Sequence, residues 1–307
     1  MTNLPRKSRR DFLRHSTGMV AGVTLAPLAA FSPDIAHAAE SSADAINAGR
    51  IYTSVKWGMI ADPGTVLDKF QLCKDIGFDG MELISPTEGF STAEVLEAAR
   101  QTQLPVHGVV DTKHWEIRLS SPNPEERTKG VAILEQALRD CQACGGFSVL
   151  LVPGRVNGTE ESHEQVWDRS IEEIRKVLPV ASHLGVRVLI ENVWNGFCET
   201  PEQLRDYVDE IASPWVGVYF DIGNVRKFGP SEDWIRVLGK RIVKLDVKDW
   251  SASSGFCKIG DGDVNWPEVR KALAEIEFTG WCTAEVEGGG REQLTDIKNR
   301  MNRVLQL

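Results

Sequence analysis

Four acidic residues lie at the ends of four successive apolar runs in the C-terminal half of the chain. They are Glu191 in Val-Leu-Ile-Glu, Asp221 in Val-Tyr-Phe-Asp, Asp246 in Val-Lys-Leu-Asp and Glu285 in Cys-Thr-Ala-Glu. Runs of this kind are typical of buried parallel strands, where an ionised carboxylate is costly unless it is paired or binds a cation. Four such residues predict a divalent metal site, and an all-oxygen set of ligands favours Mn²⁺ or Mg²⁺, with Co²⁺ and Zn²⁺ left open.

Ion pairing is the alternative explanation for these carboxylates, most of all for Asp246. Lys244 and Lys248 each lie two residues from Asp246. Residues at this spacing share one face of a strand. The sequence therefore leaves open whether Asp246 binds a metal or a lysine.

Strand-like and helix-periodic segments alternate along the chain after residue 54. The eight strand-like runs lie at 55–60, 80–84, 105–110, 148–152, 186–191, 216–221, 242–247 and 281–286. Strict alternation favours a parallel sheet with right-handed crossovers, and eight strands close it into a (β/α)8 TIM barrel. We predict an α/β protein with a single barrel domain at 54–307, whose active site lies where the strands end.

The first 38 residues have the pattern of an export signal. Ser-Arg-Arg-Asp-Phe-Leu at 8–13 precedes a charge-free apolar stretch at 18–31 and an Ala-His-Ala cleavage pattern at 36–38. The paired arginines indicate the twin-arginine route, and the apolar stretch is shorter than the roughly 20 residues of a membrane span. We expect a signal peptide at 1–38, a linker at 39–53, a periplasmic or extracellular location and no stable membrane anchor after cleavage.

Charge and cysteine content narrow the range of partners. The full chain carries a net charge of −9, and removal of the basic signal takes it to about −12. Such a field disfavours nucleic acid and anionic membranes and favours a neutral or cationic small partner. The six cysteines are expected to be buried free thiols. The sequence leaves open whether the protein forms a homo-oligomer.

Five further residues near the ends of the predicted strands are candidates for substrate binding. They are Glu82, His107, Lys248, Trp57 and Trp194. Tryptophan rings offer flat apolar faces for a substrate to pack on, whereas the polar side chains can bind substrate oxygens. The alternatives are an ion pair of Glu82 with Lys56, a structural hydrogen bond for His107, and neutralisation of the acidic cluster by Lys248.

Five short strings give the chain a family resemblance. They are Ile-Glu-Asn-Val, Phe-Asp-Ile-Gly-Asn, Leu-Asp-Val-Lys-Asp-Trp, Ile-Gly-Asp-Gly-Asp-Val-Asn-Trp and Thr-Ala-Glu-Val. Over about residues 54–305 the chain resembles the sugar phosphate isomerase/epimerase family, the xylose isomerase-like barrels. That family includes ketose 3-epimerases, hydroxypyruvate isomerases, inosose dehydratases and endonuclease IV.

The resemblance implies roles for the four acidic residues. In the ketose epimerases a divalent ion is held by Glu, Asp, His and Glu, positions that match Glu191, Asp221, Asp246 and Glu285. This chain departs from the pattern at Asp246, where the family has His or Gln. By resemblance Glu191 and Glu285 also take a proton from a carbon beside a carbonyl and return it, through an enediolate.

Three functions are consistent with these features. The first is a metal-dependent isomerase or epimerase of a keto-sugar or related polyol. The second is a lyase or dehydratase that eliminates a group from a 3-keto-glycoside at the same metal site. The third is a non-catalytic carbohydrate-binding protein. Export and the lack of a basic cluster favour a neutral sugar or glycoside over a sugar phosphate.

Overall fold

The computed structural model describes residues 51–307. The predicted signal peptide and nearly all of the predicted linker therefore lie outside the described residues. Eight strands form the central sheet: β1 Ile51–Lys56, β2 Gly80–Ser85, β3 Val106–Asp111, β4 Ser148–Leu151, β5 Arg187–Glu191, β6 Val216–Asp221, β7 Ile242–Val247 and β10 Gly280–Ala284.

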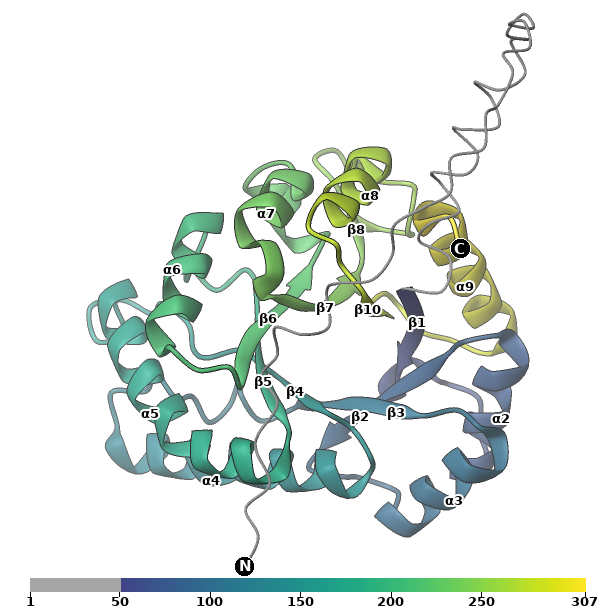
Figure 1. Ribbon diagram of the computed structural model, residues 1–307, viewed down its shortest axis with the longest axis horizontal. Coiled ribbons are helices and arrows are strands. Elements are labelled where there is room, and N and C mark those ends of the chain that lie inside the picture. The colour runs from purple at the N-terminus through teal and green to yellow at the C-terminus, as the bar shows by residue number, and fades with distance from the viewer. Residues whose placement is uncertain (1–50) are drawn as a thin grey trace, which may run out of the picture. The chain divides into compact units, whose positions relative to one another are not determined.

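Eight α-helices alternate with these strands, as Figure 1 shows. They are α2 Val66–Ile76, α3 Thr92–Thr102, α4 Pro124–Ala143, α5 His163–Leu184, α6 Pro201–Ile211, α7 Ser231–Leu238, α8 Trp266–Glu275 and α9 Arg291–Leu305. Three short 3-10 helices, η2 Trp57–Met59, η3 Asn224–Lys227 and η4 Gly239–Arg241, complete the helical elements of the described chain.

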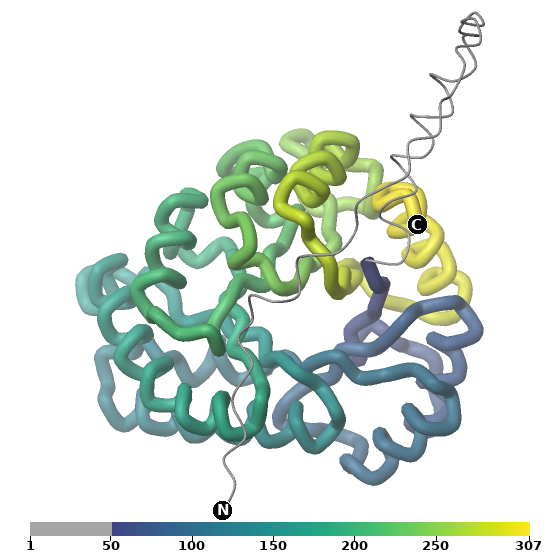
Figure 2. The backbone as a smooth tube through the Cα atoms, in the orientation of Figure 1, coloured from purple at the N-terminus to yellow at the C-terminus, as the bar shows by residue number. Residues whose placement is uncertain are grey.

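The strands close into a parallel barrel in the order β1-β10-β7-β6-β5-β4-β3-β2. Closure comes from the pairing of β1 with both β2 and β10. Figure 2 shows the chain winding round the barrel until its C-terminal helix reaches the first strand and helix. The predicted (β/α)8 TIM barrel is therefore confirmed.

Local sequence signals set the ends of the helices. Capping boxes begin α2, α3, α5 and α6, where Thr65, Ser91, Ser162 and Thr200 accept a hydrogen bond from the backbone three residues later. The helices α2 and α5 end at a glycine with a left-handed backbone. The two glycine caps lead the chain from α2 into β2 and from α5 into β5.

The first strand differs from the prediction, because it runs from 51 to 56 rather than from 55 to 60. Two of its polar residues are fully buried: Thr53 is bonded to Asp79 at 2.8 Å, and Ser54 donates to Thr283 at 2.8 Å. Because these residues inside the barrel are polar, a search for apolar runs did not find the true bounds of the strand. The barrel therefore begins three residues before the predicted boundary at 54.

A two-stranded antiparallel hairpin, β8 Asp249–Ser251 with β9 Gly255–Cys257, was not predicted. It follows β7 directly, in the connection that leads to α8. All six cysteines are free thiols, as expected, and only Cys257 is not buried. Within residues 51–307, no helix combines the length and the apolar character that a membrane crossing requires.

Candidate metal and substrate site

The four strand-end carboxylates meet at one end of the barrel. Glu191 and Asp221 are the last residues of β5 and β6, Asp246 is the fifth residue of β7, and Glu285 directly follows β10. These strands are consecutive in the barrel, and Asp221 is paired in register with Asp246. One potential ligand atom of each residue lies within 4.8 Å of those of the other three.

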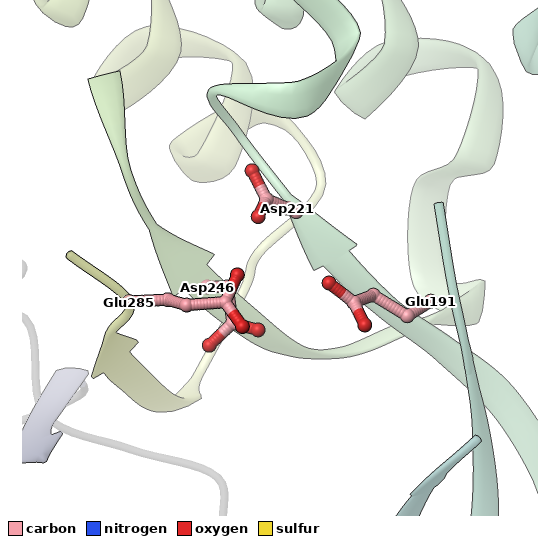
Figure 3. A group of neighbouring side chains, drawn as sticks. All are labelled: Glu191, Asp221, Asp246 and Glu285. Carbon is pink, nitrogen blue, oxygen red and sulfur yellow. The ribbon is translucent and has the colours of Figure 1, made fainter. Parts of the chain in front are cut away.

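Figure 3 shows the four side chains turned toward a common centre, with Glu191 and Glu285 on opposite sides. Asp221 and Asp246 are fully buried, and Glu191 is nearly so. The side chain of Glu285 is 30% exposed and opens the cluster to solvent. The centre is thus a small oxygen-lined site at the carboxyl ends of the strands, which we call the barrel mouth.

Two lysines insert their ammonium groups among the carboxylates. Lys56 Nζ lies 2.8 Å from Asp246 and 2.6 Å from Glu285. Lys248 Nζ lies 3.0 Å from Asp221 and 2.6 Å from Glu285. Asp246 therefore does pair with a lysine, but with Lys56 from β1 instead of Lys244 or Lys248. Lys248 lies at the site as expected.

The electrostatics of the cluster show an excess of negative charge. Burial and the neighbouring charge of Glu285 raise the pKa of Glu191 well above its ordinary value. Burial also raises the pKa of Asp246 well above normal and that of Asp221 to about 6. Glu285 is the exception, because its contacts with Lys56 and Lys248 outweigh burial and lower its pKa.

These features suit a divalent cation. Two lysines against four carboxylates leave a formal excess of two negative charges. Asp246 Oδ1 is buried without a hydrogen-bond partner in the described chain. The four potential ligand atoms, all carboxylate oxygens within 4.8 Å of one another, are the type of ligand that a hard divalent cation prefers. Glu191, Asp221, Asp246 and Glu285 would hold the ion.

Two asparagines fix the backbone behind this cluster. The Asn192 side chain accepts from the Asp221 amide and donates to the Asp221 carbonyl, both at 2.9 Å. Asn224 donates from its backbone to Asp221 Oδ1 at 2.7 Å and from its side chain to the Asn192 carbonyl at 3.0 Å. These bonds explain the Glu-Asn and Asp-Ile-Gly-Asn strings, in which sequence reasoning assigned no role to the asparagines.

Glu82 lies inside the barrel with partners from the protein itself, and its role in substrate binding stays a prediction. Its carboxylate is fully buried in the barrel, accepts from Tyr219 at 3.0 and 3.1 Å, and pairs with Lys244 at 3.2 Å. The alternative, an ion pair with Lys56, is not what the structure has. An ion pair formed entirely inside the barrel leaves no signal in the order of residues.

His107 was predicted to lie at the end of the third strand, but it is the second residue of β3 and not its last. Its imidazole is 2% exposed, bonded to Ser54 Oγ at 2.7 Å and stacked on Trp281. Burial lowers its pKa well below the ordinary value. The contacts of His107 are therefore those of the structural alternative, and its contact with a substrate stays a prediction.

A different histidine follows β3 near the mouth. His114 Nδ1 accepts from the Val152 amide at 3.3 Å, and burial, then the charge of Lys56, lowers the pKa of His114 to about 3. The imidazole is therefore neutral at physiological pH. Sequence reasoning missed it because His114 lies in the connection after β3, three residues beyond Asp111.

The two predicted tryptophans lie in connections that leave the strand ends. Trp57 begins η2 directly after β1 and packs edge-on against Phe90. Trp194, 40% exposed, follows β5, donates from Nε1 to the Asn224 carbonyl at 2.7 Å and stacks on Phe256 at 4.7 Å. Both positions are compatible with sugar contact, which stays a prediction.

Comparison with known proteins gives concordant matches. A family model described as a xylose isomerase-like TIM barrel matches residues 70–304. L-ribulose-5-phosphate 3-epimerase UlaE of Escherichia coli is 24% identical, over 70% of this chain and 79% of the relative. An uncharacterized protein of Methanocaldococcus jannaschii is 22% identical, over 73% of this chain and 80% of its own length.

Solved structures of epimerases share the fold. A structure of L-ribulose 3-epimerase superposes with a TM-score of 0.73 at 16% identity, covering 83% of this chain and 95% of that one. The 3-keto-D-glucoside 4-epimerase YcjR of E. coli gives 0.70 at 16% identity, covering 84% and 99%. At these identities the likeness establishes the barrel.

Proposed function

The chain belongs to the xylose isomerase-like TIM barrel family, and from that premise we propose that it is a metal-dependent epimerase or isomerase of a keto-sugar. The observation that carries the proposal is the single centre formed by Glu191, Asp221, Asp246 and Glu285. Named relatives support the reaction class, since UlaE and the L-ribulose enzyme are both 3-epimerases.

The two glutamates are suited to proton transfer. They lie on opposite sides of the centre (Figure 3), so a sugar carbon between them would present one face to each. Lys56 and Lys248 both contact Glu285, each at 2.6 Å, so the two glutamates lie in different electrostatic surroundings. Carboxyl groups in different surroundings can divide the roles of acid and base.

A bound divalent cation would supply the positive charge that polarises the sugar carbonyl and makes the neighbouring C–H bond acidic. Lys56 and Lys248 would orient Glu285 and offer ammonium donors to substrate oxygens. The asparagines hold Asp221 in place. Mn²⁺ or Mg²⁺ suits the all-carboxylate set best, with Co²⁺ or Zn²⁺ as weaker candidates.

Metal removal and reloading tests this proposal. The purified protein is stripped with a chelator, reloaded with Mn²⁺, Mg²⁺, Co²⁺ or Zn²⁺, and incubated with a panel of ketoses and keto-glycosides. We expect new epimers or isomers, detected by NMR, only with reloaded protein. A Glu285→Gln variant that folds and takes up metal but still converts every substrate at the wild-type rate would contradict the proposal.

A further inference from the structure

A cavity of about 420 Å³ opens beside the metal site and shares Lys248 and Glu285 with it. One wall is the hairpin β8–β9 with the residues that follow it, and the opposite wall is α9. The volume lies within the range of small-molecule sites. A substrate with its reacting carbon between the glutamates could extend a second group into this cavity.

Four apolar side chains contribute to the lining of the cavity. Ile259 and Ile297 are buried, Val286 is partly buried, and Phe256 is 49% exposed. Phe256 already contacts Trp194 at 4.7 Å and Lys248 at 5.0 Å, yet half of it remains accessible. An apolar ring placed here would bury surface that the protein alone leaves in water.

The charges at the rim argue against a phosphate. Arg300 is paired with Asp296 and with Asp261, both at 2.9 Å, and Lys258 lies 3.5 Å from Asp296. Lys248 is neutralised by Asp221 and Glu285. Glu287 adds a further negative charge to the lining. Anion binding requires cations or amide donors that are not already matched by carboxylates.

The carboxylate of Asp249 makes several of the bonds that hold the hairpin wall in place. Asp249 accepts from the amides of Trp250, Gly260 and Val264 and from the indole of Trp266, at 2.9 to 3.3 Å. These bonds tie the hairpin to the connection that leads into α8. The cavity is therefore preformed, which lowers the entropic cost of binding.

We propose that the substrate is a neutral glycoside whose sugar ring lies at the carboxylate centre and whose apolar, ring-containing aglycone fills the cavity beside Phe256 and Val286. This inference rests on the proposed function for the chemistry at the sugar. It adds the substrate class, and it names two residues that distinguish glycosides from free sugars. Sugar phosphates are disfavoured because the cations around the cavity are already paired with carboxylates.

Paired probes test the inference. Metal-loaded protein is given 3-keto-D-glucose or phenyl 3-keto-β-D-glucoside in D₂O, and deuterium entry into the sugar is followed by NMR. We expect the phenyl glucoside to have the higher kcat/KM, by about tenfold, the upper part of the range for an aromatic contact. A wild-type protein that reacts equally with both, or better with the free sugar, would overturn the inference.

Two variants examine the cavity itself. Val286→Trp, which fills it, and Phe256→Ala, which removes its aromatic wall, should each reduce the phenyl preference, the first to about one. Leu96→Ala, at an exposed apolar residue of α3, is the control and should keep the wild-type ratio. An unchanged ratio in both cavity variants, with thermal unfolding intact, would contradict the assignment.

Binding of an unreactive probe separates this inference from the proposed function. Phenyl β-D-glucoside has no keto group and cannot react by proton abstraction. Calorimetry should detect its binding to wild-type protein and at least fivefold weaker binding to Val286→Trp. If phenyl β-D-glucoside binds with this pattern but neither keto-sugar takes up deuterium, the proposed chemistry is contradicted and the cavity assignment stands. If deuterium enters the keto-sugars without such binding, the cavity assignment is contradicted and the proposed chemistry stands.

Discussion

At the scale of single residues, the site is a balance between carboxylates and lysines. Lys56 and Lys248 each contact Glu285 and one further candidate ligand. The acidic positions could be predicted from sequence, because each ends an apolar strand. The position of Lys56 at the site could not be predicted, because its partners Asp246 and Glu285 are 190 and 229 residues away in the sequence. Only barrel closure between β1 and β10 brings them together.

Removing the Lys56 charge should tighten metal binding. An ammonium group in contact with Asp246 and Glu285 repels any cation that these residues hold, and the repulsion is strong in a buried setting. Calorimetric titration of the Lys56→Met variant with Mn²⁺ should give an affinity higher than wild type by about tenfold or more. Lys240→Met, a surface lysine on η4, makes the same charge change as a control. Equal or weaker binding by Lys56→Met would refute this view of the site.

Breaking the buried pair below the site should destabilise the barrel. Lys244 and Glu82 are both fully buried, so Lys244→Met leaves an uncompensated carboxylate at a cost of about 3–5 kcal/mol in the free energy of unfolding. Urea denaturation measures that loss. The double variant Glu82→Gln with Lys244→Met should recover most of it. A single variant as stable as wild type would show that the pair is not the stabilising contact.

At the scale of elements, strand ends determine which residues reach the mouth. Alternating strands and helices made the barrel predictable, and strands five to seven end at or within one residue of their predicted ends. The third strand was ended at 110, although β3 continues to Asp111. Because His107 was taken as a strand-end residue, it was predicted to contact the substrate although it is buried. His114 was overlooked. The hairpin β8–β9 is too short to produce a periodic pattern.

The hairpin should depend on Asp249. Asp249→Ala removes the acceptor for three amides and one indole, and the loss of several bonds to a charged group should cost about 3–5 kcal/mol in the free energy of unfolding. Asp263→Ala in the same connection removes one exposed bond, to the Ala252 amide, and should cost under about 1 kcal/mol. Denaturation curves that show similar losses for both variants would contradict the anchoring role.

At the scale of the whole molecule, an acidic barrel follows an N-terminal segment with the twin-arginine pattern. We propose that the folded, metal-loaded protein is exported by this route to the periplasm or beyond. Such a location agrees with a neutral glycoside substrate, since it lies outside the compartment of sugar phosphate metabolism. The acidic charge agrees with a small sugar partner.

Export should fail when the paired arginines are replaced. Arg9→Lys with Arg10→Lys keeps the charge and removes the feature that the twin-arginine route recognises. Cell fractionation with an antibody should find this variant in the cytoplasm, and the control Arg14→Lys in the periplasm or the medium. Export of the double variant at the wild-type level would contradict the assigned route.

The most direct measurement is solvent deuterium entry at the substrate carbon, followed by NMR with wild type, Glu191→Gln and Glu285→Gln loaded with the same metal. Wild type should place deuterium beside the sugar carbonyl. Each variant should be slower by about 100- to 10,000-fold, the usual contribution of an acid or base, while thermal unfolding stays close to wild type. Exchange at the wild-type rate in both folded, metal-loaded variants would contradict the assignment of these glutamates.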